Sequence, residues 1–594
     1  MSKEQRSESA VSHSEYIKEE EMAEENEAPK RVSRRQFVKG AAVGGAGVAA
    51  AGVLASCAPA ATPAPAPTCP PTPTCPPAEE CAPCAVPGVP ETWDMETDVV
   101  VVGSGTGLAG ALAAAVAGAK VIVLEKMAAA GGTTGISGGV IWIPNNSVMK
   151  AEGIEDSREN ALTYLRLVAQ GQADDEIIEA FADRGPEMAD FVAANSPIVW
   201  GVSTIMGNGA EYHPEWPGAV YPVGRSLDPV SDVVGFKGPV LIQGLLDGCE
   251  AKGGEVLLES PAKRLITRLL PDGVQEVLGV VAESGGETIN IKANKGVILA
   301  AGGIDWNFDM KKHFLRGPTP YTCGVPGDNG DGVLMAMAVG ADLRNMNECW
   351  GFPVYKEEAE AKLAQKVPAA LIAEFEAPSA GAIMVNRYGE RFCNEASDYD
   401  SIWRSFFAWE NWGALRYRNL PAYTIFDNKV RTNATIGGAT ADKPLPAWVK
   451  QADTLKGLAE ALGVDPDGLE KTVSEFNENA KQGKDPQFHR GESYHDTAAA
   501  IVVEAMLAPL EESPFYGAEV AAGDIGTCGG ARVNKNAQVL NPFGEVIPRL
   551  YCAGNNSGVG GPGASYGGGG GTVGPGMVFA YIAGQHVVTL DPWE

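Results

Sequence analysis

Apolar residues gather in short continuous runs separated by glycine-rich turns, and the clearest series of runs opens at Asp98. Asp98–Val102 is a β-branched run of the kind found in buried parallel strands. Leu108–Ala117 is rich in alanine and is followed by Gly118, which predicts a helix with a glycine after its last turn. Val121–Leu124 is the next apolar run. The pattern predicts a strand–helix–strand unit and places the chain in the α/β class.

The turn between the first strand and the helix carries Gly103, Gly105 and Gly107. Glycines here let the backbone approach a pyrophosphate at the positive N-terminus of the helix. Glu125 ends the second strand, about 20 residues after Gly103, where an acid can bind a ribose hydroxyl. We interpret the unit as a Rossmann-like, dinucleotide-binding motif. An ordinary tight turn is the alternative, because Gly107 comes one residue early and the next glycine is Gly110.

Residues 1–56 are not predicted to belong to the fold. A polar, Glu-rich stretch precedes Arg34-Arg35, an Ala/Gly-rich run from Gly40 and the sequence Leu54-Ala55-Ser56-Cys57. This order resembles a twin-arginine export signal closed by a lipoprotein cleavage site. We therefore expect an exported lipoprotein, anchored by lipid on Cys57 to the outer side of the cytoplasmic membrane. A transmembrane helix is the alternative, disfavoured by the composition and short length of the run.

Residues 57–92 are rich in Pro, Ala and Thr, a composition that favours extended polyproline and buries no core. We predict a linker here. For its cysteines we favour disulfides or free thiols over ligands of a metal or iron–sulfur centre. These are Cys69, Cys75, Cys81 and Cys84. The remaining cysteines are predicted to be small core residues: Cys249, Cys323, Cys349, Cys393, Cys528 and Cys552.

Composition and charge limit the classes of function. Hydrophobic residues make up 45% and charged residues 20% of the chain, which allows a large core. The net charge of −29 repels phosphate backbones and argues against nucleic acid as a partner. The 6 histidines show no metal-ligand spacing, so no metal site is predicted.

The segment that follows the second strand reads Ala130-Gly131-Gly132-Thr133-Thr134-Gly135-Ile136-Ser137-Gly138-Gly139. It resembles the loop that runs along the flavin in FAD-binding flavoproteins of the fumarate reductase and 3-ketosteroid dehydrogenase family. A strand ending at Gly302-Gly303 and the C-terminal Ala553-Gly554-Asn555 follow in the family's order. The resemblance implies FAD. The predicted cofactor-binding residues are Gly103, Gly105, Gly107, Glu125, Lys126, Gly132, Thr133, Thr134, Ser137, Gly138, Gly139, Gly302, Gly554 and Asn555.

By the same resemblance, a Rossmann-like FAD-binding domain (residues 93–344 and 526–594) is split in sequence by an inserted α+β capping domain (residues 345–525) that carries catalytic residues. Relatives that attach FAD covalently through histidine place it just before the glycine loop. This chain has Met127-Ala128-Ala129-Ala130 there. We therefore predict non-covalent FAD.

Two positions bear on the substrate. Fumarate reductases of this family hold a dicarboxylate with arginines, since buried carboxylates require paired cations. One arginine follows the Asn-Glu of the cap, where this chain has Tyr399, and another precedes a Gly-Gly near the C-terminus, where it has Tyr566. The replacements favour a neutral carbonyl compound.

The tyrosines resemble the pattern of 3-ketosteroid Δ1-dehydrogenases. By that resemblance, the Tyr566 hydroxyl and the Gly570 amide bind the C3 carbonyl oxygen and stabilise the enolate. Tyr399 removes the C2 proton with help from Tyr212, and FAD N5 takes hydride from C1. Because a tyrosine ordinarily has a pKa of about 10, we expect the site to lower the pKa of this base. Residues 567–571 lack the family's proline before the functional glycine, so Gly570 is chosen by its spacing.

We carry three hypotheses for the function. The first is an FAD-dependent 3-oxosteroid 1-dehydrogenase that passes electrons to a membrane quinone or another carrier. The second is a reductase of an α,β-unsaturated acid such as fumarate or urocanate, against which the missing arginines count. The third is a surface flavoprotein that only relays electrons. The direction of the reaction stays open, because one site can add or remove a hydrogen pair.

Overall fold

The computed structural model describes residues 88–204, 211–271, 273–369, 381–498, 506–559 and 565–594. The predicted export signal and the linker up to residue 87 lie outside the described residues. All described residues belong to one compact unit, Ala82–Glu594. None of the helices in the described part of the chain has both the length and the apolar character needed to cross a membrane.

The first sheet has eight strands and begins with the predicted unit. Strand β1 (Met95–Val102) is central and pairs in parallel with β2 (Val121–Leu124) and with β9 (Glu287–Leu299). Residues 99–101 are fully buried, as expected for a central parallel strand. Helix α2 (Gly107–Val116) connects β1 to β2. The strand–helix–strand prediction is therefore confirmed.

Strands from the middle and from the C-terminal part of the chain complete this sheet. The strand order is β20-β21-β9-β1-β2-β6, and β8 joins β7 to β9 at an antiparallel edge. Strand β21, from the C-terminal part, pairs in parallel with β9. The remaining strands are β6 (Glu255–Leu257), β7 (Ala262–Leu269), β8 (Gln275–Ser284), β20 (Gln538–Leu540) and β21 (Val546–Cys552). The split of the flavin domain in sequence thus corresponds to a single sheet.

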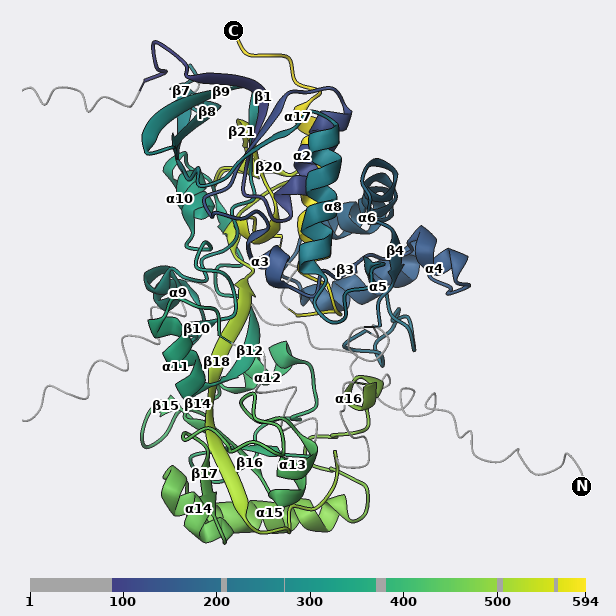
Figure 1. Cartoon of the computed structure of the whole chain (residues 1–594), viewed down its shortest axis with the longest axis vertical. Helices are drawn as coiled ribbons and strands as arrows, with labels where there is room; N and C mark the ends of the chain where they lie inside the picture. The colour runs from purple at the N-terminus through teal and green to yellow at the C-terminus, as the bar shows by residue number, and fades with distance from the viewer. Residues whose placement is uncertain (1–87, 205–210, 272, 370–380, 499–505, 560–564) are drawn as a thin grey trace, which may run out of the picture. The chain divides into compact units, whose positions relative to one another are not determined.

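Helix α17 (Val573–Val587) packs along α2, and the two lie side by side in Figure 1. Their contact explains a glycine that did not fit the fingerprint. A Cβ on Gly110 would lie 2.6 Å from the carbonyl oxygen of Ala580, and one on Gly584 would lie 2.2 Å from the carbonyl oxygen of Gly110. Gly110 is therefore required by helix packing.

Other helices of this half lie around the sheet. Helix α8 begins at Gly238-Pro239 and packs against α2 and α3. These helices are α3 (Gly132–Ile136), α4 (Ser147–Ala151), α5 (Arg158–Ala169), α6 (Asp175–Asn195), α8 (Gly238–Ala251) and α10 (Asp331–Ala338). A three-stranded sheet, in the order β3-β5-β4, consists of β3 (Ile141–Trp142), β5 (Ser226–Pro229) and β4 (Trp200–Val202).

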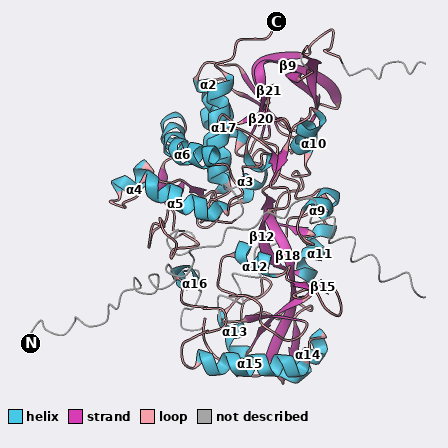
Figure 2. Ribbon diagram, turned by 180° about the vertical axis from the view of Figure 1, so that it is seen from behind, coloured by secondary structure: helices cyan, strands magenta, loops and turns pink. Residues whose placement is uncertain are grey.

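A six-stranded sheet forms the cap around the long strand β18 (Phe515–Thr527), which Figure 2 shows with α14 and α15 near one end. Its other strands are β10 (Tyr321–Thr322), β12 (Cys349–Tyr355), β13 (Ile383–Asn386), β16 (Ala422–Phe426) and β17 (Lys450–Ala452). Strand β10 already belongs to this sheet although it precedes residue 345. The boundaries at 345 and 525 stay a prediction, while the α+β character of the cap agrees with the prediction.

The cap helices surround this sheet: α9 (Phe308–Phe314), α11 (Lys356–Ala364), α12 (Tyr399–Ser405), α13 (Asn428–Asn433), α14 (Leu455–Leu462), α15 (Pro466–Ala480) and α16 (Tyr494–Ala498). The smaller elements are β11 (Leu343–Arg344) with β19 (Gly530–Ala531), β14 (Trp409–Glu410) with β15 (Arg416–Tyr417), and the 3₁₀ turn η3 (Gly554–Asn556). The cysteines predicted to be core residues are all buried.

Candidate active site

A cavity of about 510 Å³ lies where glycine loops of the first sheet meet the cap. Its cofactor side consists of the turn after β1, the loop 131–138, the end of β9 and the start of η3. Its other side includes Phe352 from β12 and Tyr399 from α12, both in the cap. All the predicted catalytic residues line it: Tyr212, Tyr399, Tyr566 and Gly570.

The turn after β1 has the close packing that a dinucleotide site requires. Gly103 has φ 104°, and a Cβ there would lie 2.2 Å from the carbonyl oxygen of Ala300. Glu125 is buried, and its carboxylate accepts hydrogen bonds from the amides of Ser104 (3.2 Å) and Met127 (2.8 Å). A fixed acid beside a bare glycine turn at a helix N-terminus fits the ribose and pyrophosphate of FAD.

The second glycine loop is fixed to a turn that precedes α10. Thr133 Oγ1 donates to Asp328 Oδ2 at 2.5 Å and accepts from the amide of Val325 at 3.0 Å. Lys126 Nζ donates to Asp331 Oδ2 at 2.6 Å. Burial raises the pKa of Asp328 to about 6. Asp328 and Asp331 line the cavity but were missed by the sequence analysis, although Gly327-Asp328-Asn329-Gly330-Asp331 has the composition of a turn.

Nearly all predicted cofactor residues line the cavity, and two do not. Gly107 is absent from the wall because α2 packs there against β1 and β9, and a Cβ on Gly107 would lie 3.1 Å from Val101 and 3.0 Å from Ala300. Gly139 meets the backbone of Lys237 instead, with a Cβ 2.5 Å from its carbonyl carbon. Both glycines serve close packing of the site's walls.

The three predicted tyrosines come from distant segments and lie together. The hydroxyl of Tyr212 is 3.3 Å from that of Tyr399. The ring of Tyr566 lies 5.4 Å from the ring of Tyr212 and 5.3 Å from that of Tyr399. All three are buried, and Trp350 and Phe352 pack against them. The arrangement is an aromatic wall with hydroxyl groups.

The electrostatic environment differs from the expectation for a tyrosine base. Burial raises the pKa of Tyr399 well above its ordinary value, and Tyr212 and Tyr566 raise it further. Burial also raises the pKa of Tyr566, although hydrogen bonds to Thr572 and Tyr399 lower it. Tyr399 is therefore a neutral hydroxyl in this environment. A neutral tyrosine accepts a proton only if it passes its own proton on.

The glycine loop 567–570 is tied through each of its carbonyl oxygens. Gly570 has φ 89°, and a Cβ there would lie 2.7 Å from Ile141. Its N–H has no hydrogen-bond acceptor among the described residues. The donors to the carbonyls are Tyr164 Oη (2.6 Å) and the Tyr212 amide (3.1 Å) to Gly567, the Gly571 amide to Gly568 (3.0 Å), Ser226 Oγ to Gly569 (2.6 Å), and the amides of Trp142 (3.1 Å) and Gly574 (2.9 Å) to Gly570. An unpaired amide on a fixed loop in the cavity wall suits an oxyanion donor.

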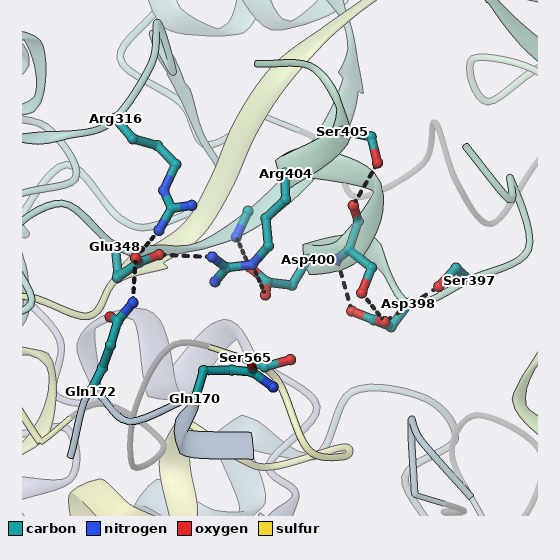
Figure 3. Close-up of polar contacts among 12 residues, drawn as sticks. Gln170, Gln172, Arg316, Glu348, Ser397, Asp398, Asp400, Arg404, Ser405 and Ser565 are labelled. Carbon is teal, nitrogen blue, oxygen red and sulfur yellow. Dashed lines mark hydrogen bonds and ion pairs between the residues drawn. The ribbon is translucent and has the colours of Figure 1, made fainter. Parts of the chain in front are cut away.

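Helix α12 positions Tyr399 at its first residue. Asp398 caps it by accepting the Ser401 amide at 2.9 Å. Arg404, one turn on, donates to Asp400 at 2.9 Å and to Glu348 at 3.0 Å. Figure 3 shows Arg316, Arg404 and Gln172 converging on Glu348. The network fixes α12 to the loop before β12 and, through Gln172, to the segment after α5.

Cationic groups are scarce in the cavity wall. Among the described residues that line it, Lys126 is the only Lys or Arg, and it is paired with Asp331. Elsewhere in the described ranges, no group of three or more His, Cys, Asp and Glu side chains is arranged to hold a metal ion. The part of the wall that the structure describes therefore presents no cation that is free to pair with a carboxylate substrate.

Sequence analysis also missed His495, a buried residue of α16. Its ring lies 4.7 Å from that of Tyr212. Burial lowers the pKa of His495 to about 4. Its Nε2 has no hydrogen-bond partner among the described residues. No local motif marks this histidine, since only the folded cap brings it to Tyr212.

Known proteins resemble this chain in sequence and in structure. A family model described as the FAD binding domain matches residues 98–572. The 4-oxocyclohexanecarboxylate 2-dehydrogenase of Sinomonas cyclohexanicum is 33% identical, over 82% of this chain and 92% of its own length. The 3-oxosteroid 1-dehydrogenase of Mycobacterium tuberculosis is 33% identical, over 83% of this chain and 98% of its own. The structure of a 3-ketosteroid delta1-dehydrogenase from Sterolibacterium denitrificans, in complex with 1,4-androstadiene-3,17-dione, matches 83% of this chain and 99% of its own, with a TM-score of 0.74 and 30% identity.

Proposed function

The chain belongs to the family of FAD-binding oxidoreductases, and we propose that within this family it dehydrogenates a neutral cyclic 3-oxo compound, a 3-oxosteroid above all, at C1 and C2. The predicted family, fold class, enzyme class and cofactor FAD are confirmed by the family match and the relatives. The substrate of this chain and the roles of single residues are the proposal.

The observation that carries the proposal is the convergence of the tyrosines with an unpaired amide. Tyr566 and Gly570 lie four residues apart in one segment, and both line the cavity. A hydroxyl and an N–H from one segment suit a single carbonyl oxygen. Tyr399 brings the third polar group, and Phe236 and Phe352 line the same cavity.

Each residue of the proposed site has one role in the reaction. Tyr566 Oη and the Gly570 N–H bind the carbonyl oxygen and stabilise the enolate as C2 loses its proton. Tyr399 Oη accepts this proton as it gives its own to Tyr212 Oη, 3.3 Å away, and Tyr212 in turn gives up its hydroxyl proton to solvent water, so that one proton leaves the site. FAD, when bound, supplies the acceptor for the hydride that leaves C1. The substrate thereby loses a proton and a hydride and gains a C1–C2 double bond.

The relatives support the kind of substrate. They are named as dehydrogenases of 4-oxocyclohexanecarboxylate and of a 3-oxosteroid, and both of these named substrates contain a ring ketone. The carboxylate of the second compound has no free cation to meet in the described wall of this cavity. A neutral ring system is favoured for that reason.

The two other hypotheses are less well supported. A fumarate-type or urocanate-type reductase requires cations for the acid, and among the described residues of the wall the one Lys or Arg is Lys126, which is paired with Asp331. A relay flavoprotein has no use for an aromatic cavity with hydroxyl groups opposite the cofactor loops. The third hypothesis also conflicts with the relatives, which are named as enzymes that act on a substrate.

Export and electron transfer complete the proposal. The sequence Arg34-Arg35 and Cys57 support a lipid-anchored protein on the outer side of the cytoplasmic membrane. A membrane quinone is the proposed electron acceptor, since the anchor keeps the enzyme beside the bilayer. Both statements rest on sequence alone.

The experiment is a substrate comparison on purified holoprotein. A 3-oxo-4-ene steroid is incubated with an artificial electron acceptor, beside fumarate and urocanate with reduced viologen. We expect a 1,4-diene-3-one product and no turnover of either acid. Turnover of an acid without turnover of the steroid would refute the proposal.

A further inference from the structure

A buried ion cluster lies behind the glycine loop 567–570. Arg225 donates from Nε and Nη2 to the carboxylate of Asp156, at 2.7 Å each, and from Nη1 to Glu211 Oε1 at 2.7 Å. The side chains of Arg225 and Glu211 are completely buried. The cluster does not line the cavity, so it does not contact a substrate or cofactor there.

Trp142 connects this cluster to the loop through two different hydrogen bonds. Its indole Nε1 donates to Glu211 Oε2 at 2.6 Å. Its backbone N–H donates to the carbonyl oxygen of Gly570 at 3.1 Å. One residue thus joins the Glu211 carboxylate to the peptide group that follows the proposed oxyanion donor.

A second connection runs directly from the cluster to the loop. Glu211 and Gly568 form an antiparallel β-bridge. A Cβ on Gly568 would lie 2.8 Å from Trp142 and 3.1 Å from Glu211 Oε2, so the loop lies flat on both side chains. The next residue, Tyr212, donates its amide to the carbonyl of Gly567 at 3.1 Å. The same segment therefore positions the loop and Tyr212.

We propose that the Arg225–Glu211 ion pair is a positioning device for this reaction. In its ionised form Glu211 holds Trp142, and Trp142 holds the loop so that the Gly570 N–H and the Tyr566 hydroxyl meet one oxygen. Loss of the carboxylate charge releases the loop. The inference rests on the function proposed above and adds Glu211, Arg225 and Trp142 as positioning residues.

Arg225 keeps Asp156 as a partner when Glu211 is protonated, so the charge that is lost is the one on the acceptor of the Trp142 indole. A hydrogen bond to a charged acceptor is about twice as strong as one between neutral groups, so the Trp142 contact weakens when Glu211 is neutral. The charged and titratable groups that face Glu211 are Arg225, Asp156 and Tyr164, from three different segments. Burial raises the pKa of Glu211 to about 7, with Arg225 opposing it. The loop should therefore loosen as the pH falls below about 7.

The decisive experiment follows Trp142 in the holoprotein. Protein labelled with ¹⁵N-tryptophan shows both the indole and the backbone amide of this residue, and Trp142→Phe assigns them. We expect both signals to shift together with one apparent pKa of about 7 and to stop titrating in Glu211→Gln. An indole that titrates while the amide stays fixed would overturn the proposal. This measurement needs no substrate, so it tests the coupling between Glu211 and the loop even if the proposed function is wrong.

The kinetic test uses a matched control. Glu276 is another buried glutamate, paired with Arg268 and Arg549 and outside the cavity wall. We expect Glu211→Gln to lower kcat by on the order of 10²-fold, the cost of displaced catalytic groups, with KM little changed. The fall of kcat on the acid side of the pH profile, near pH 7 in the parent, should be absent from this variant. Glu276→Gln should keep the parent's pH profile. The same acid limb in Glu211→Gln as in the parent would contradict the proposal. If the parent turns over no 3-oxo compound, the proposed function fails separately.

Discussion

The hydroxyl groups of Tyr212 and Tyr399 lie 3.3 Å apart although 187 positions separate the residues in the chain. The first lies between β4 and β5 of the three-stranded sheet of the flavin half, and the second begins α12 of the cap. Their contact therefore exists only when the cap is seated on the cavity. Because burial raises the pKa of Tyr399 and keeps it neutral, the proposed mechanism uses this contact as the route by which the Tyr399 proton leaves.

Removing the hydroxyls tests the division of roles. Tyr566→Phe should keep the fold and FAD binding but lose one donor to the enolate, which typically costs about 10²–10³ in rate. Tyr399→Phe should cost as much or more, because it removes the proposed base. The double variant should lose less than the product of the single effects, since both groups act on one enolate-forming step. Steady-state kcat with a 3-oxosteroid measures this, and single variants within about twofold of the parent would be too active for either role.

Gly570 offers a test of the loop by its backbone. Gly570→Ala places a Cβ 2.7 Å from the backbone of Ile141, which is too close for a real contact. It also puts a side chain on a residue at φ 89°. We expect loss of kcat similar to that of Tyr566→Phe, because the N–H moves with the backbone. Gly569→Ala is the control, since its nearest neighbour would be 3.6 Å from the added Cβ. Equal activity of the two alanine variants would argue against the amide as donor.

Local patterns predicted the strand–helix–strand unit of the flavin half, and the family resemblance pointed to the tyrosines, but neither predicted what surrounds those tyrosines. Glycines at a strand end and an acid about 20 residues later report a cofactor directly, because the backbone itself approaches the ligand. His495 and Glu211 carry no such mark, since each acquires its environment from segments far away in sequence. The expected lowering of the Tyr399 pKa failed for the same reason: the sequence does not show how completely its hydroxyl is buried.

The mode of FAD attachment is tested by denaturation. The chain has no histidine just before the glycine loop, so acid or heat precipitation should release free FAD into the supernatant. The absorbance of the supernatant and of the washed, redissolved pellet measures the two fractions. A yellow pellet that withstands washing would show a covalent bond.

Location is tested at the two ends of the proposed signal. Lysine at both Arg34 and Arg35 should leave the protein in the cytoplasm, because the export route reads the arginine pair. Cys57→Ser should release an exported protein from the membrane fraction, since it removes the lipid attachment site. Fractionation and immunoblotting measure both. Cys57→Ser protein that stays with the membrane would identify the apolar run as the anchor.

The last prediction concerns His495 and has a defined sign. The folded state lowers its pKa from 6.5 to about 4, so between these values the unfolded chain binds the extra proton and the free energy of unfolding rises with pH. Burial of the neutral His495 ring therefore costs no stability above pH 6.5, where the ring is neutral in both states. Stability is lost as the pH falls toward 4, because the unfolded chain then takes up a proton that the folded state does not. The groups that face the ring are Tyr212, Asp398 and His213, and Asp398 opposes the shift. His495→Gln should therefore narrow the stability difference between pH 6.5 and pH 4 by about 3 kcal/mol at most, at 1.36 kcal/mol for each unit of pKa. Urea unfolding of parent and variant at both pH values measures the difference, and His313→Gln, an exposed histidine, is the control. If His495→Gln and the parent lost equal stability on acidification, the ring would not be held neutral beside Tyr212.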